Sequence, residues 1–233
     1  MKTTESAARI INLSDEEAVK TVLAESVLGL WKVVNSLSRL RPTRERYRVA
    51  IFGSARAQPG TPVYEEVKRV AGAFAALGCD IVTGGGPGLM QAANEGAKAA
   101  GAPGSMGIRV ELPFEQEANP FVEQAFEHET FFTRLQHFVI ASDAFVVVPG
   151  GIGTVLETLM IWQLLQVRHA ENVPLVLVGT MWKGLVDWAH ASMLDPRLPL
   201  ASPEDLRIPR CVDTADEAIA LVTDLHAEWR AAR

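Results

Sequence analysis

The sequence predicts an α/β protein with a Rossmann-like, doubly wound parallel sheet and an additional N-terminal helix. From residue 48 onward, short and almost continuous apolar runs alternate with longer stretches at helical spacing. Such alternation is typical of a parallel sheet covered by helices on both faces. The chain has 233 residues, 48% of them apolar, which is enough for one large core. We therefore expect a helix and linker over residues 1–47 and a Rossmann-like domain over residues 48–233.

The N-terminal part carries a helix signal followed by an arginine-rich run. Ser14 precedes Glu17 by three residues, the spacing of a capping box, and apolar residues then recur at helical spacing to about Leu40. This predicts one helix whose apolar face packs on a core or on a partner. Five arginines fall within residues 39–48. We interpret this run as a solvated connector; the alternative is a patch that binds nucleic acid.

In the second part, the apolar runs set the order of the elements. Strands are expected at residues 49–52, 80–83, 105–110, 144–148 and 175–178, and helices at 64–77, 89–100, 130–141, 154–168, 182–193 and 215–229. The proline-bearing stretches 111–129 and 194–210 are expected to be loops, the second with one short turn. Ligands of doubly wound sheets bind beyond the carboxyl ends of the strands, so a site is expected there.

Charge and cysteine content limit the classes of function. Lys and Arg total 22 against 28 Asp and Glu, a net charge of −6. This disfavours nucleic-acid binding through summed phosphate contacts, which needs a basic face. Cys79 and Cys211 cannot build a disulfide framework, and residues 1–14 contain no apolar signal segment. We therefore expect a cytoplasmic protein, and no apolar run is long enough to span a membrane.

Glycine-bearing turns follow three of the expected strands. They are Gly53-Ser54-Ala55-Arg56, Gly84-Gly85-Gly86-Pro87-Gly88 and Gly150-Gly151-Ile152-Gly153-Thr154. Glycine lets backbone N–H groups approach a phosphate closely, and a following helix adds partial positive charge. The alternative for any one of them is a tight turn that needs a positive φ. Three such turns at one sheet edge favour a nucleotide or sugar-phosphate site.

Several cofactor classes lack their signatures. No Gly-x-x-x-x-Gly-Lys-Ser/Thr phosphate loop occurs, and the first turn is not Gly-x-Gly-x-x-Gly. The second strand runs into Thr83-Gly84 without an acidic residue for a ribose hydroxyl, so a redox dinucleotide fits poorly. The histidines are scattered without metal-ligand spacing and are expected at the surface or behind the site. We expect neither a metal nor another cofactor.

Two charged residues near the third turn have competing interpretations. Thr154 and Glu157 have capping-box spacing, which would make Glu157 a helix cap. The same carboxylate beside a phosphate loop could instead activate water or stabilise a cationic sugar. Arg134 precedes the strand that feeds this turn, as either a salt-bridged surface residue or a cation of the site. The spacing alone leaves both questions open.

The sequence resembles the LOG (lonely guy) family of phosphoribohydrolases, formerly labelled lysine decarboxylases. Residues 149–157 match Pro-Gly-Gly-x-Gly-Thr-x-x-Glu, residues 84–90 resemble the first glycine block of the family, and Arg134 stands at its arginine. The resemblance covers roughly residues 48–225. It implies hydrolysis of the N-glycosidic bond of a nucleoside 5′-monophosphate, AMP or a cytokinin relative, to free base and ribose 5-phosphate.

The resemblance also implies roles for individual residues. Arg134 and Glu157 would be the catalytic pair. The substrate and its phosphate would be held by a larger set, which comprises Gly53, Ser54, Gly85, Gly86, Met90, Gly150, Gly151, Gly153 and Thr154. Family members are usually dimers or higher oligomers through helices beside the third turn, where an apolar surface is expected from Met160, Ile161, Trp162, Leu164 and Leu165. The competing use of these residues is core packing against the sheet, which must take at least one face of the helix. A homodimer is expected.

Two positions depart from the family pattern. Leu135 stands where lysine is common, and Leu156 stands where an acidic residue is common. Altered substrate choice is one consequence. The alternative is a binding protein without turnover, which would carry a nucleotide or molybdenum cofactor. Lysine decarboxylation has no support, because it needs a lysine that binds pyridoxal phosphate and no lysine lies in a glycine turn.

Overall fold

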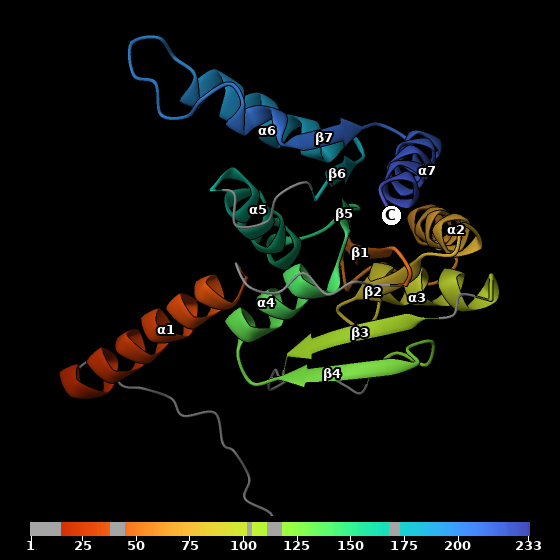
Figure 1. Ribbon diagram of the computed structural model, residues 1–233, viewed down its shortest axis with the longest axis horizontal. Helices are drawn as coiled ribbons and strands as arrows, with labels where there is room; N and C mark the ends of the chain where they lie inside the picture. The colour runs from red at the N-terminus through yellow and green to blue at the C-terminus, as the bar shows by residue number, and fades with distance from the viewer. Residues whose placement is uncertain (1–14, 38–44, 102–103, 111–117, 168–172) are drawn as a thin grey trace, which may run out of the picture.

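The computed structural model describes residues 15–37, 45–101, 104–110, 118–167 and 173–233. Its centre is one parallel sheet of seven strands in the order β4-β3-β2-β1-β5-β6-β7 (Figure 1). The strands are β1 (Arg48–Phe52), β2 (Asp80–Thr83), β3 (Ser105–Val110), β4 (Gln124–His128), β5 (Ala144–Val147), β6 (Leu175–Val178) and β7 (Pro209–Val212). The predicted doubly wound, Rossmann-like fold is confirmed.

Helices cover both faces of this sheet. They are α1 (Glu16–Leu37), α2 (Pro62–Ala76), α3 (Leu89–Ala99), α4 (Phe131–Ala141), α5 (Ile152–Gln166), α6 (Thr180–Met193) and α7 (Ala215–Ala231), with a 3₁₀ turn at Asp205–Arg207. Helices α2, α3 and α7 pack around Ile51 and Val146, whereas α4, α5 and α6 pack around Phe52 and Phe145. Successive residues of β1 therefore enter opposite cores, which is why the strand is a continuous apolar run.

The winding direction of the sheet changes between β1 and β5. Strand β1 pairs with β2 on one side, where Ala50 lies opposite Val82, and with β5 on the other, where Phe52 lies opposite Val147. From this pair of strands the chain winds outward in both directions. Ligands of such sheets bind beyond the carboxyl ends of the strands at this switch point. The loops that follow β1 and β5 border it.

Both edge strands lie in stretches that we expected to be loops. Strand β4 is largely exposed, and its polar sequence contains no apolar run. Strand β7 begins with Pro209, which is acceptable at the first residue of an edge strand because no ladder hydrogen bond is lost there. The loop predictions for 111–129 and 194–210 are therefore wrong at these strands. Edge strands meet water, so they do not need the continuous apolar pattern that identified the inner ones.

The predicted N-terminal helix is present as α1, which packs beside α4 and extends away from the body (Figure 1). The side chain of Asp15 accepts a hydrogen bond from the N–H of Ala18 at 3.1 Å, while Ser14 lies outside the described residues. Within the arginine-rich run, Arg46 and Arg48 bind the buried carboxylate of Asp80, at 2.8 and 3.3 Å. These two arginines therefore neutralise the buried negative charge of Asp80 at the amino end of β2.

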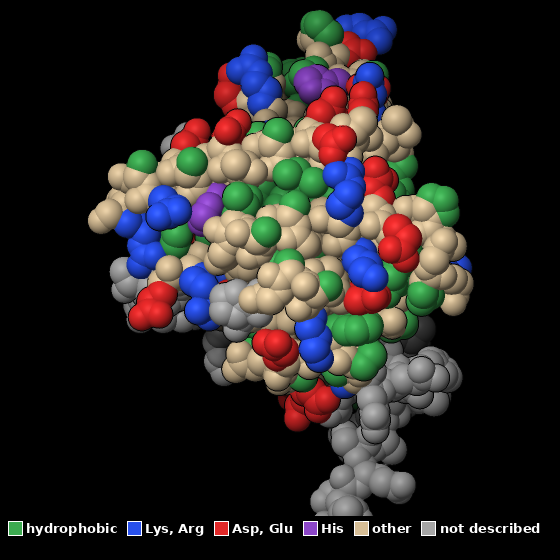
Figure 2. All heavy atoms as spheres, turned by 90° about the vertical axis from the view of Figure 1, so that its right-hand side faces the viewer, with side chains coloured by type: hydrophobic (Ala, Val, Ile, Leu, Met, Phe, Trp, Pro, Cys, Tyr) green, Lys and Arg blue, Asp and Glu red, His purple; other side chains and the backbone are tan. Residues whose placement is uncertain are grey.

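Charges of both signs are mixed over the side of the molecule on which α2, α3 and α7 lie. Figure 2 shows Lys and Arg side chains interspersed with Asp and Glu there, without a large patch of one sign. Between α2 and α7, Arg69 forms an ion pair with Asp216 at 2.6 Å. Among the described residues, no helix combines the length and apolar character needed to cross a bilayer.

Candidate functional site

The three glycine turns are joined at the carboxyl edge of the sheet. The N–H of Ser54 donates to the carbonyl of Pro149 at 3.1 Å, and the N–H of Leu89 donates to the carbonyl of Ser54 at 2.8 Å. The turn after β1 is thus held between the other two. Gly88 has φ +71°, and a Cβ there would run into the backbone of Ser54 and Ala55. Glycine at this position is what allows the close approach.

The third turn opens onto free space at the start of α5. Gly151 is the N-cap and no side chain caps the helix. A Cβ on Gly151 or Gly153 would have no heavy atom within 4 Å, and the side chain of Ile152 is 87% exposed. Gly150 differs, because a Cβ there would run into Thr154. An uncapped helix start offers backbone N–H groups and partial positive charge to an anion.

Arg134 and Glu157 form an ion pair at this edge. The Nη1 of Arg134 lies 3.0 Å from the Oε1 of Glu157, and their side chains are 12% and 10% exposed. The Nε of Arg134 donates to the carbonyl of Ile108 at 2.8 Å, so the guanidinium also binds the end of β3. The ring of Phe138 lies 5.4 Å from its Cζ. These contacts fix Arg134 between β3, α4 and α5.

The capping-box interpretation of Thr154 and Glu157 is wrong. Because α5 begins at Ile152 after the N-cap Gly151, Thr154 is already the third residue of the helix. Glu157 points to Arg134 on α4 instead. Of the two interpretations of Arg134, the salt bridge is real, but its partner is the carboxylate beside the third turn.

The ion pair lies against the second glycine turn. A Cβ on Gly84 would run into the Nη2 of Arg134 and would lie 2.6 Å from the Sδ of Met90. Met90 is the second residue of α3. Gly84 therefore gives both the guanidinium and the thioether room to lie on the turn. Arg134, Glu157, Met90 and the three turns form one continuous region.

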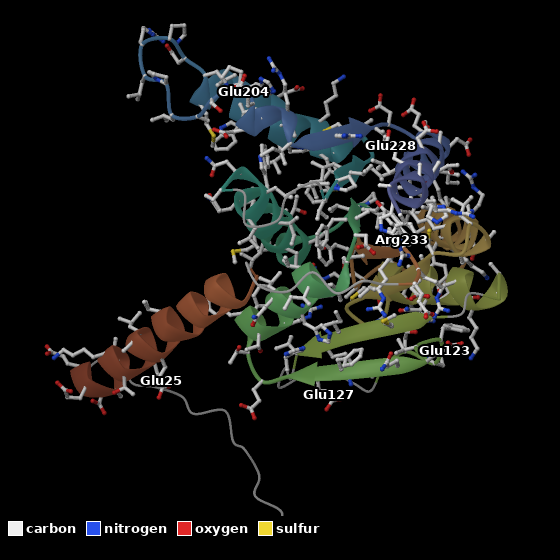
Figure 3. The ribbon with its side chains drawn as sticks, in the orientation of Figure 1. Glu25, Glu123, Glu127, Glu204, Glu228 and Arg233 are labelled. Atoms are coloured by element: carbon white, nitrogen blue, oxygen red, sulfur yellow. The ribbon has the colours of Figure 1, made fainter. Side chains whose placement is uncertain are left out.

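Sequence reasoning missed a second arginine beside the same turn. Arg109 lies near the carboxyl end of β3, and its Cγ would be 3.0 Å from a Cβ on Gly85. Its Nη1 pairs with Glu127 at 3.1 Å, and Figure 3 shows Glu127 on the edge strand β4. The available signal was the one charged residue within the strand expected at residues 105–110. Sequence reasoning also missed Asn94 and Asn119, which meet beneath this turn at 3.0 Å.

Two histidines meet near the arginine, although we expected all histidines to be scattered. The Nε2 of His128 lies 3.0 Å from the Nδ1 of His137, which joins the end of β4 to α4. Burial lowers the pKa of both rings, and the positive charge of Arg134 lowers the pKa of His128 further. Across the described part of the chain, no three His, Cys, Asp or Glu side chains are grouped so as to hold a metal ion.

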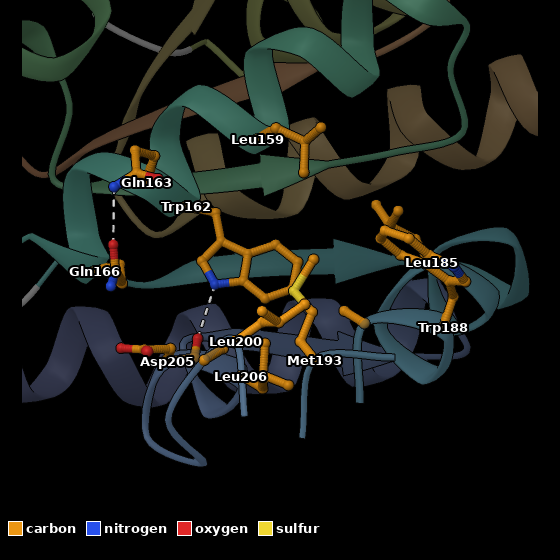
Figure 4. A pocket seen from close by; sticks show the side chains of 12 residues that line it. Leu159, Trp162, Gln163, Gln166, Leu185, Trp188, Met193, Leu200, Asp205 and Leu206 are labelled. Atoms are coloured by element: carbon orange, nitrogen blue, oxygen red, sulfur yellow. Dashed lines mark hydrogen bonds between the residues drawn. The ribbon is translucent and has the colours of Figure 1, made fainter. Parts of the chain in front are cut away.

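A separate pocket of about 300 Å³ lies between α5, α6 and the segment before β7 (Figure 4). Trp162 and Trp188 contribute to its lining, and the indole N–H of Trp162 donates to the carbonyl of Asp205 at 2.8 Å. None of the predicted site residues lines it. The pocket is apolar at its centre and has Gln163 and Gln166 at its side.

Of the five residues expected to form an apolar surface on α5, three contribute to the core, whereas Met160 and Leu164 are half-buried. Ile161 and Trp162 are buried against the sheet, and Leu165 packs against the same core. The exposed apolar side chains of α5 are instead Ile152, Leu156 and Leu159. Residues spaced four and three apart share one helix face, so these three form a stripe on its outer side.

Comparison with known proteins places this site in context. Residues 90–222, more than half of the chain, match the model of the family described as "Possible lysine decarboxylase". The cytokinin riboside 5′-monophosphate phosphoribohydrolase of Mycobacterium marinum is 31% identical over 123 residues, which cover 50% of this chain and 63% of that protein. The match thus spans less than two thirds of that relative's length.

Solved structures share the fold at low sequence identity. The molybdenum cofactor carrier protein of Chlamydomonas reinhardtii superposes with a TM-score of 0.59 at 22% identity, over 78% of this chain and 99% of that one. The molybdenum cofactor binding protein of Rippkaea orientalis gives a TM-score of 0.58 at 18% identity, over 79% and 99% of the two chains. At such identities the likeness establishes the fold alone.

Proposed function

The chain belongs to the family described as "Possible lysine decarboxylase", the LOG family, and we propose that it is a nucleoside 5′-monophosphate phosphoribohydrolase. The single observation that carries this proposal is the Arg134–Glu157 ion pair, which lies against the glycine turns at the switch point. The printed name of the Mycobacterium marinum relative supports it. The proposed substrate is AMP or a cytokinin riboside monophosphate.

The proposed binding mode assigns the phosphate to backbone groups. The uncapped start of α5 and the open space at Gly151 and Gly153 suit an anion, and Thr154 lies just inside this helix. The other residues predicted to contact the substrate lie in or beside the three glycine turns at the carboxyl edge of the sheet. They are Gly53, Ser54, Gly85, Gly86, Met90 and Gly150. A local anion site of this kind is compatible with the overall charge of −6, because oriented N–H groups supply the attraction.

The proposed reaction breaks the bond between the base nitrogen and C1′ of the ribose. Positive charge develops on the ribose as the base leaves, and the carboxylate of Glu157 stabilises it and orients the attacking water. The water oxygen forms the new bond to C1′, one of its protons passes to the departing base, and the products are free base and ribose 5-phosphate. Arg134 holds one carboxylate oxygen and so fixes the direction of the other.

The test is a panel of nucleoside monophosphates assayed for free base by chromatography. We expect adenine from AMP, and a loss of at least about 100-fold in Glu157→Gln and in Arg134→Ala, the range for a positioned acid–base group. The matched controls are Glu66→Gln and Arg207→Ala, at exposed positions outside the proposed site. Both should keep full activity. No base from any nucleotide, with a protein that is folded by circular dichroism, contradicts the enzymatic proposal.

A second candidate is a carrier that binds a nucleotide or molybdenum cofactor without turnover. The printed titles of the structural neighbours from Chlamydomonas reinhardtii and Rippkaea orientalis are consistent with it. It is favoured by Leu135 and Leu156, which replace side chains that are charged in the LOG pattern. This candidate predicts tight binding of a pterin cofactor or nucleotide with no released base. Release of adenine from AMP by the wild type contradicts it.

We propose in addition that the protein is a homodimer. The exposed stripe of Ile152, Leu156 and Leu159 lies on the outer side of α5, next to the apolar pocket. Exposed apolar patches with polar surroundings are typical of protein interfaces. The proposed partner is a second copy of the chain.

A further inference from the structure

Four buried polar side chains lie together beneath the second glycine turn. Thr83 ends β2, Asn94 lies on α3, Ser105 begins β3, and Asn119 precedes β4; each is at most 7% exposed. The carbonyl oxygen of the Asn94 side chain accepts from the hydroxyl of Thr83 at 2.7 Å and from the amide of Asn119 at 3.0 Å. Its Nδ2 donates to the hydroxyl of Ser105 at 2.9 Å. The polar cluster is therefore a connected network.

This network holds the backbone of the turn by several atoms. The N–H of Gly85 donates to the hydroxyl of Thr83 at 2.9 Å. The carbonyl of Gly85 accepts from the N–H of Asn119, and the carbonyl of Gly86 accepts from its side-chain Nδ2, both at 2.9 Å. Gly85 itself has φ +71°, a conformation that glycine adopts without strain. Two consecutive carbonyl oxygens of the turn are thus bound by one residue, Asn119.

The direction in which these two carbonyl oxygens point affects whether the turn can bind an anion. A carbonyl oxygen carries partial negative charge, and it repels a phosphate when it faces one. In a free turn the Gly85–Gly86 peptide unit can rotate and present either its N–H or its C=O to a ligand, whereas the Gly86–Pro87 unit has no N–H and can present only its C=O. Because Asn119 binds the oxygens of Gly85 and Gly86, these peptide units cannot turn those oxygens toward an anion without breaking buried hydrogen bonds.

We propose that Thr83 and Asn119 are positioning residues that keep the second glycine turn in its anion-accepting conformation. This inference rests on the proposed function, because it takes the turn to contact the phosphate of a nucleotide. Neither side chain is proposed to touch the substrate; both act through the backbone of Gly85 and Gly86. An asparagine is needed at 119 since an aspartate has no N–H to donate to the carbonyl of Gly86.

The test uses hydroxyl and amide variants of the full chain. Thr83→Val removes the hydroxyl at nearly constant volume, Thr83→Ser restores it, and Asn119→Asp replaces the donor with an acceptor. Thr223→Val is the matched control, since the hydroxyl of Thr223 donates to the carbonyl of Ile219 on the distant helix α7 at 2.7 Å. The measurements are Kd for AMP and for adenosine by calorimetry, made in the Glu157→Gln background so that AMP is not consumed, kcat and KM for base release with Glu157 present, and amide hydrogen exchange of residues 84–88 without ligand.

The expected result is a loss that depends on the phosphate. Thr83→Val and Asn119→Asp each remove one side-chain hydrogen bond to the turn backbone and one within the network. Both should weaken AMP binding and raise KM by at least about tenfold. The Kd for adenosine and kcat at saturation should stay within about twofold. Exchange of residues 84–88 should be faster in both variants, whereas Thr83→Ser and Thr223→Val should match the wild type.

Three results would overturn the inference. They are equal losses for AMP and adenosine, a fall in kcat at constant KM, and unchanged exchange of residues 84–88 in Thr83→Val. A purely structural role would give the second pattern, because partial unfolding lowers the amount of active protein without changing KM. A wild type that fails to bind AMP contradicts the proposed function itself, whereas a wild type that binds AMP and variants that bind it equally contradict only this inference.

Discussion

The guanidinium of Arg134 lies 3.0 Å from the carboxylate of Glu157, although the two residues belong to different helices, α4 and α5. The same guanidinium binds the carbonyl of Ile108 and lies against Gly84. One side chain therefore joins the carboxylate, the end of β3 and the second glycine turn. This arrangement limits how Arg134 can be replaced.

Arg134→Lys should lower kcat/KM for base release by about 10- to 100-fold. Lysine keeps the positive charge but cannot bind Ile108 and Glu157 at once, because it lacks the planar fork of donors. The measurement is initial-rate release of adenine from AMP, with Arg207→Lys as the exposed control. Activity equal to that of the wild type would mean that charge alone is required of this position.

The inner strands of the sheet could be predicted because their burial is visible in the local sequence pattern. The inner strands β1 and β6 are buried on both faces, so every position after Arg48 in β1 and every position in β6 is apolar, and the pattern is visible in the sequence. The edge strand β4 has one face and one side in water, and its polar residues are compatible with a loop as well as with a strand. Pairing with β3 decides between them, and that pairing is not encoded locally.

Two identical spacings show why the site could be predicted only in part. Thr214 and Glu217 form a complete capping box at the start of α7. Thr154 and Glu157 have the same spacing, yet their helix starts earlier, at a glycine, and the carboxylate pairs with Arg134 instead of capping the helix. The motif indicated which residues matter. The contact between helices that gives Glu157 its partner depends on how α4 and α5 pack on the sheet.

Gly88→Ala should destabilise the protein by about 3 kcal/mol or more, because it combines a left-handed backbone with a collision against Ser54. Gly60 has φ +80° with open space around it, so Gly60→Ala should cost only about 1 kcal/mol. Urea unfolding of both variants measures the difference. Equal losses would show that the close approach of the two turns contributes nothing to stability.

Gly153→Ala should separate nucleotide affinity from stability. The position lies in the first turn of α5 with open space beside it. Alanine should therefore leave the free energy of unfolding unchanged or raise it by up to about 0.5 kcal/mol. A methyl group there should nevertheless weaken AMP binding by about tenfold if the phosphate approaches this turn. Gly184 lies within α6 and also has open space beside it, so Gly184→Ala is the control. It should change the free energy of unfolding by a similar amount and leave AMP binding unchanged. Calorimetric titration with AMP would contradict the prediction if both variants bound equally well.

Protonation of the His128–His137 pair should destabilise the fold at acidic pH. Burial lowers the pKa of both rings below the ordinary value of 6.5. The unfolded chain therefore binds protons more readily than the folded one, so the free energy of unfolding should fall as the pH decreases from about 7.5 to 5.5. His137→Gln should reduce this fall. It should not abolish it, because burial also lowers the pKa of His226.

Urea unfolding at the two pH values gives the measurement for the histidine pair. His190→Gln, on the exposed side of α6, is the control and should keep the wild-type pH dependence. If His137→Gln and His190→Gln lose stability equally between the two pH values, the buried pair is not responsible for the acid sensitivity.

Leu159→Glu should convert the protein from dimer to monomer. Leu159 is 44% exposed, belongs to the outer stripe of α5 and lines the neighbouring pocket, so a carboxylate there would be buried unpaired in an interface formed by this face. Sedimentation at several protein concentrations gives the mass, and circular dichroism checks the fold. Ala227→Glu introduces the same charge at an exposed position of α7 and should remain dimeric. A monomeric wild type, or a Leu159→Glu variant that sediments as a dimer, would exclude this face as the interface, and the exposed leucines of α5 would then need another partner.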